Sequence, residues 1–73
     1  MTAALTDYAD RKAQAKSLIQ RLSTALEAHQ AKANESPRNW GYANDLGAFN
    51  SELINALDRV GGLTASEREL YRL

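Results

Sequence analysis

The sequence predicts an all-α protein, an antiparallel helical hairpin followed by a short third helix. Apolar residues recur at alternating steps of three and four from Leu5 to Ala33, which is the spacing of a helix that packs along another helix. A break at residues 36–42 contains proline and glycine, and a second amphipathic run follows it. A glycine pair then separates a final short segment from that run.

The first helix is predicted over about residues 7–33, with Thr6 as its N-cap. Two polar residues, Lys12 and His29, interrupt its apolar stripe, which we call the seam. Each either extends its polar tip to water over an apolar stem or sets the register of helix pairing. The seam consists of Leu5, Tyr8, Lys12, Ala15, Ile19, Leu22, Leu26, His29 and Ala33.

The second helix is predicted to end near residue 60, before Gly61 and Gly62. Its start has two alternatives. Ser36 and Pro37 form a common helix-start pair, which favours a start at 37, whereas Gly41 favours a start near 44. The pattern Thr64-Ala65-Ser66-Glu67 is a capping box and predicts a third helix over about 65–72.

Apolar residues on the flanks of both long helices predict self-association. A single hydrophobic core of this size supplies only about 3–5 kcal/mol, and the chain has no cysteine for disulfides. The flanking residues cannot all face one partner helix, so we expect a bundle built from a homodimer. The residues expected in this contact are Leu18, Ala25, Ile54 and Leu57.

Composition predicts a single helical domain over residues 1–73 without catalytic chemistry. The nine basic and nine acidic residues cancel, which argues against a strong field for nucleic acid. With no cysteine and one histidine, no metal site or cofactor is expected, and no catalytic residue is assigned because nucleophile and phosphate-loop motifs are missing. Because these motifs are missing, the protein is expected to be non-enzymatic. No run is apolar enough for a membrane span, and a cytoplasmic protein is expected.

Residues 38–42 contain arginine, tryptophan and tyrosine, the residue types typical of binding hot spots, and this segment is the candidate site for a protein partner. Two interpretations of Trp40 stand side by side: the ring packs against Leu26 or Ala33 at the hairpin end, which we favour, or it docks on a partner. The candidate partner-binding residues are Arg38, Asn39, Trp40 and Tyr42.

An alternative function is a small dimeric regulator associated with nucleic acid. Residues 11–38 contain six basic and two acidic residues, a local charge of +4. These basic residues spread around the predicted helix and form no single stripe, so nucleic acid is the less favoured partner.

The run Asn39-Trp40-Gly41-Tyr42-Ala43-Asn44-Asp45-Leu46 resembles small uncharacterised plasmid and phage proteins. Those proteins carry an Asn/Asp-Trp-Gly element a few residues before an Asp-Leu helix start, and Asn44 stands where that pattern has glycine. The resemblance implies an accessory protein of a mobile element, which would bind and inhibit or adapt a host macromolecule. It implies no catalytic role.

Overall fold

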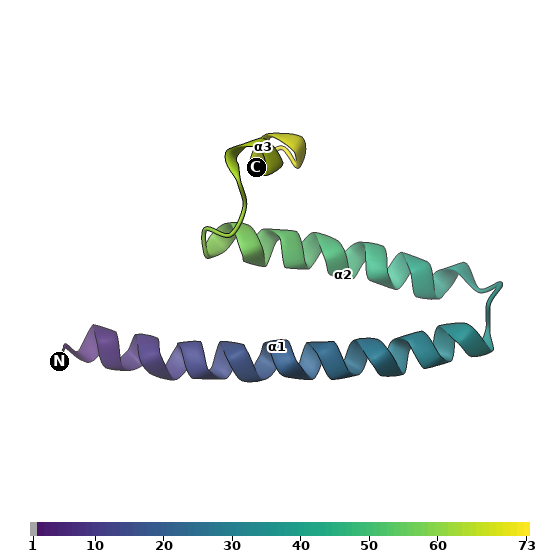
Figure 1. Cartoon of the computed structure of the whole chain (residues 1–73), viewed down its shortest axis with the longest axis horizontal. Helices are drawn as coiled ribbons and strands as arrows, with labels where there is room; N and C mark the ends of the chain where they lie inside the picture. Colours follow the sequence, from purple (N-terminus) through teal and green to yellow (C-terminus); the bar gives the residue numbers. More distant parts are fainter. Residues whose placement is uncertain (1) are drawn as a thin grey trace. The chain divides into compact units, whose positions relative to one another are not determined.

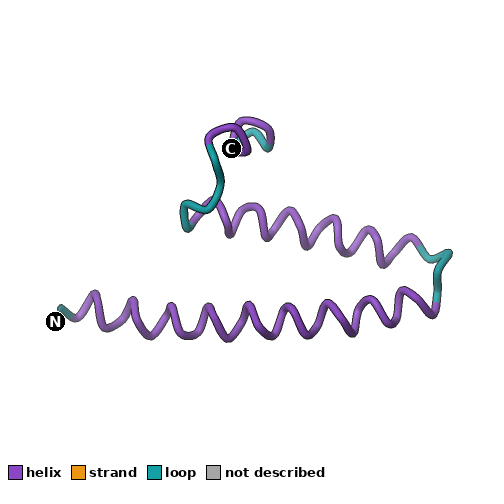
Figure 2. Tube along the Cα trace, viewed as in Figure 1, coloured by secondary structure: helices purple, strands orange, loops and turns teal. Residues whose placement is uncertain are grey.

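The computed structural model describes residues 2–73, and these residues form three α-helices and no strand. They are α1 (Ala3–Glu35), α2 (Trp40–Arg59) and α3 (Ala65–Leu70), which confirms the predicted all-α class (Figure 1). The chain divides into two compact units, one ending at Pro37 and one spanning Arg38–Leu73. Short loops precede α2 and α3 (Figure 2).

The first helix is longer than predicted at both ends. Its N-cap is Thr2, whose hydroxyl accepts a hydrogen bond from the Leu5 amide at 3.2 Å, so the assignment of Thr6 as the cap is wrong. The helix begins early because Ala3, Ala4 and Leu5 are strong helix formers, and at its other end it continues through Asn34 and Glu35. Ser36 caps the end, and its amide donates to the Ala33 carbonyl at 3.1 Å.

The second helix begins at Trp40, between the two predicted starts. Its N-cap is Asn39, whose side-chain oxygen accepts a hydrogen bond from the Gly41 amide at 2.9 Å. Pro37 therefore follows the end of α1, a common place for proline, rather than opening α2. Gly41 lies inside the first turn of the helix and does not delay it.

Gly61 and Gly62 end α2 in a Schellman motif, as their position predicted. The Gly62 amide donates to the Leu57 carbonyl at 2.8 Å, and the Gly61 amide donates to the Asp58 carbonyl at 3.0 Å. Gly61 has φ +77°, a conformation that other residues adopt only with strain. A Cβ on Gly62 would lie 2.9 Å from Leu57 Cγ, so a larger residue at this position would force the Leu57 side chain to shift.

The predicted capping box of α3 is present. The Glu67 amide donates to Thr64 Oγ1 at 3.1 Å, and the Thr64 amide donates to Glu67 Oε1 at 3.0 Å. Arg68 Nε lies 2.7 Å from Asp58 Oδ1 and so joins α3 to the last turns of α2. The helix ends at Leu70, earlier than predicted, because Arg72 takes a left-handed conformation with φ 61°.

No residue among those described is buried, although 44% of the chain is hydrophobic. The helices are held by their own backbone hydrogen bonds, their caps and a few ion pairs, while their apolar faces remain accessible. The half-buried residues are His29, Ala33, Tyr42, Leu46, Phe49, Ile54, Asp58, Leu63 and Glu67.

Candidate functional site

The start of α2 holds an exposed tryptophan on a fixed backbone. Because Asn39 caps the helix, Trp40 occupies its first position, where the backbone is helical. Trp40 exposes 78% of its surface. The packing of its ring on Leu26 or Ala33, which belong to the other unit, stays a prediction.

Asn39 has a positioning role that the sequence did not assign to it. Its side-chain Oδ1 accepts a hydrogen bond from the Gly41 amide, so the cap holds this side chain against the start of α2. A Cβ at Gly41 would lie 3.0 Å from that same oxygen, so glycine leaves room for the cap. Asn39 and Gly41 together therefore fix where Trp40 projects.

The other two predicted binding residues lie on either side of this cap. Arg38 is exposed, and its guanidinium offers five donors to carboxylates or phosphates. Tyr42 is half-buried and presents less surface. We call residues 38–42 the corner segment. Its accessible part is the Trp40 ring, with the Arg38 cation close to it in sequence.

The seam of α1 is a second exposed surface. Its exposed fractions are 59% at Leu5, 68% at Tyr8 and 64% at Ile19, falling to 40% at Leu22 and 36% at Leu26. Apolar side chains thus remain open to water along most of a 33-residue helix. The sequence pattern identified the seam as a packing face but did not reveal how much of it stays uncovered.

The residues predicted for self-association are also accessible to different degrees. Leu18 and Leu57 expose 46% and 45% of their surfaces, Ala25 is exposed, and Ile54 is half-buried. Leu18 and Ala25 directly precede the seam residues Ile19 and Leu26, so they widen the apolar face of α1 on one flank.

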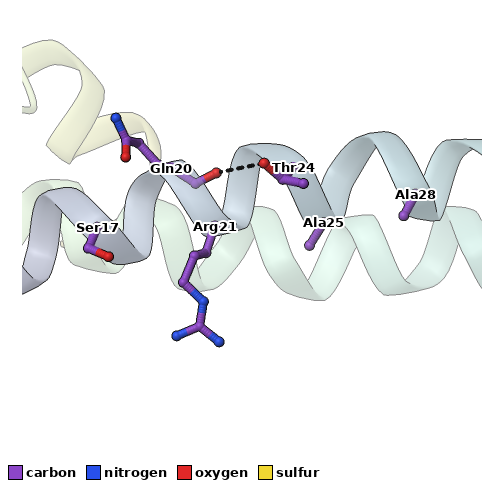
Figure 3. Close-up of a pocket in the computed structure, with 6 residues that line it drawn as sticks. All are labelled: Ser17, Gln20, Arg21, Thr24, Ala25 and Ala28. Atoms are coloured by element: carbon purple, nitrogen blue, oxygen red, sulfur yellow. Dashed lines mark hydrogen bonds between the residues drawn. The ribbon is translucent and has the colours of Figure 1, made fainter.

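Another face of α1 carries a shallow hollow lined by small and polar side chains (Figure 3). The Thr24 hydroxyl donates to the Gln20 carbonyl of the same helix at 3.3 Å, and the Arg21 side chain extends away from the helix (Figure 3). The lining contains no acid or imidazole that could activate a hydroxyl as a nucleophile. The lining residues are Ser17, Gln20, Arg21, Thr24, Ala25 and Ala28.

Within residues 2–73, no group of three or more His, Asp or Glu side chains is placed to hold a metal ion. In the same range, none of the three helices combines the length and the apolar character needed to cross a membrane.

No protein-family model matches the chain, and neither curated proteins nor solved structures gave a match. The candidate surfaces are therefore argued from their own geometry.

Proposed function

We propose that this chain is a non-enzymatic protein-interaction module whose partner-binding surface is the corner segment. Trp40 would insert its ring into an apolar pocket of the partner, and Arg38 would pair with a carboxylate beside that pocket. The observation that carries the proposal is the 78% exposure of Trp40 at the capped first position of α2.

Two physical arguments support this surface. Tryptophan and arginine are the residue types that most often dominate binding energies at protein interfaces. A side chain on a fixed helix start also loses less conformational freedom on binding than one on a flexible loop, which favours affinity.

The biological setting of this proposal rests on the resemblance of residues 39–46 to plasmid and phage proteins. In that setting the module is a cytoplasmic accessory protein of a mobile element, and its partner is a host protein that it inhibits or adapts. The partner class would be a protein with an apolar pocket bordered by acidic side chains.

A second candidate, a dimeric regulator bound to nucleic acid, draws on the local charge of +4 over residues 11–38. All six basic residues in this range are exposed and accessible to phosphates. This candidate requires an affinity that falls steeply with salt, and the absence of a mobility shift at low salt would exclude it.

The test is affinity capture from the native host, with and without nuclease, comparing the wild type with Trp40→Ala. Val60→Ala is the matched control, since Val60 is also a large apolar residue of the second unit and exposes 79% of its surface. Circular dichroism of each variant establishes that the helices are intact.

We expect a nuclease-resistant protein partner that the wild type and Val60→Ala retain and Trp40→Ala loses. Truncation of a central tryptophan should weaken the purified complex by about 2 kcal/mol or more, measured by titration calorimetry. Equal capture by all three chains would remove the corner segment as the site, and a nuclease-sensitive catch would favour the regulator.

A further inference from the structure

The seam of α1 points to a partner of defined length and spacing. It repeats with strict alternating steps over four heptads of one unbroken helix, without the insertion that would let the stripe drift. At 1.5 Å per residue, α1 is about 50 Å long and α2 about 30 Å. No other helix among the described residues matches α1 in length, whereas α1 of a second copy does.

We propose that α1 pairs with α1 of a second copy of this chain, in antiparallel orientation and in one register. The seam positions form two alternating series, one repeating every seven residues from Leu5 and the other every seven residues from Tyr8. In an antiparallel pair, each residue of one series faces a residue of the other series on the second helix, and two facing residues form one layer of the interface. A large and a small residue can therefore fill a layer together. The register places these residues opposite each other, the second of each pair belonging to the partner subunit: Tyr8 and Ala33, Lys12 and His29, Ala15 and Leu26, and Ile19 and Leu22.

This register satisfies three requirements together. The polar interruptions of the seam, Lys12 and His29, share a layer, so neither is set against an apolar residue. The small residues Ala15 and Ala33 each oppose a large one, which fills the layers without cavities. The dyad axis passes between the two layers in which Ile19 of one copy faces Leu22 of the other, at the apolar centre of the seam.

Alternative arrangements fail on the same residues. A parallel pair would set Lys12 against Lys12 of the partner subunit, two like charges in one layer. Shifting the antiparallel register by one heptad toward the N-terminus sets Lys12 against Leu22 of the partner subunit, and the opposite shift sets His29 against Ile19 of the partner subunit. Each shift places a polar side chain against an apolar one.

The flanks of the seam agree with this arrangement. Leu18 faces Ala25 of the partner subunit on one flank, which again pairs a large residue with a small one. On the other flank Lys16 faces Ser23 of the partner subunit, so no charge is repelled there. The one unfavourable pair is Arg11 with Lys32 of the partner subunit, at each exposed end, and Asp7 partly neutralises Arg11 through its carboxylate at 2.7 Å.

This surface is separate from the corner segment, so the two proposals fail independently. Sedimentation equilibrium of the full chain up to high micromolar concentration is the first test. We expect a dimer whose association tightens as salt rises, because salt screens the like-charged Arg11 and Lys32 pairs. A monomer throughout this range would overturn the proposal.

Ile19→Glu, which places a charge at the dyad, should raise the dissociation constant of the dimer about a hundredfold or more. Ser17→Glu is the matched control, since Ser17, two residues before Ile19, lies on the opposite face of the helix from the seam, and its dimer should resemble the wild type. Equal dissociation constants for the two variants would contradict the assignment of the seam.

A cysteine experiment tests orientation and register without disturbing the seam, and the natural chain has no cysteine to interfere. Chains carrying Leu18→Cys and Ala25→Cys are mixed in a glutathione buffer, and the disulfides are identified by mass spectrometry. We expect the mixed disulfide between the two variants to dominate. A predominant disulfide between two Leu18→Cys chains would instead assign the register that is shifted by one heptad toward the N-terminus. A disulfide yield no higher than that of the same chains unfolded in urea would exclude the pairing.

Discussion

α1 and the α2–α3 segment differ in the interactions that hold them. Over its 33 residues α1 has a cap at each end, Thr2 and Ser36, an Asp7–Arg11 ion pair and a Thr24 hydroxyl bond to its own backbone. The second unit has such interactions closer together along the chain: the Asn39 cap, the Schellman motif, the capping box and the Asp58–Arg68 ion pair.

The two units therefore obtain their order from different sources. The ends of α2 and α3 are determined by short-range chemistry, in which a few neighbouring residues satisfy one another's backbone groups. Under the proposed pairing, the order of α1 depends on its long apolar repeat, which stabilises a helix when another surface covers it. The first unit is therefore the one whose stability should respond to a second copy.

The largest expected effect on the second unit comes from its glycines. Gly62→Ala should destabilise the junction of α2 and α3 by about 1–3 kcal/mol, because the new Cβ would crowd Leu57 Cγ and lie 3.2 Å from the Leu57 carbonyl oxygen. Amide hydrogen exchange of residues 65–70 measures the loss.

Gly47→Ala is the control for that substitution. No atom lies within 4 Å of a Cβ at Gly47, in the interior of α2, so alanine should stabilise this helix by up to about 1 kcal/mol. If both glycine substitutions shifted exchange in the same direction, the close approach at Gly62 would not determine the junction.

A smaller effect is expected at the capping box. Thr64→Ala removes the acceptor of the Glu67 amide and should cost α3 about 1 kcal/mol, while the exchange of α1 amides stays unchanged. Thr64→Ser keeps the hydroxyl and should retain most of the protection. Loss of protection in α1 with Thr64→Ala would mean that the two units do not differ as described.

The sequence predicted the all-α class, the Gly61–Gly62 end of α2 and the capping box of α3, because each depends on residues adjacent in the chain. The boundaries of α1 and the start of α2 were less accurate, since several residues there can act as an N-cap and only Thr2 and Asn39 do so. The candidate site was predicted in part: Trp40 was singled out, but its exposure depends on where α2 begins, and the capping role of Asn39 was missed.

We infer that α1 gains its stability from association, whereas the α2–α3 junction does not. Amide hydrogen exchange of the full chain, measured by NMR at low and high protein concentration, tests it directly. We expect the protection of amides near Ile19 and Leu22 to rise strongly with protein concentration, whereas the protection of the Glu67 and Gly62 amides changes little. Protection of α1 that is the same at both concentrations would contradict it.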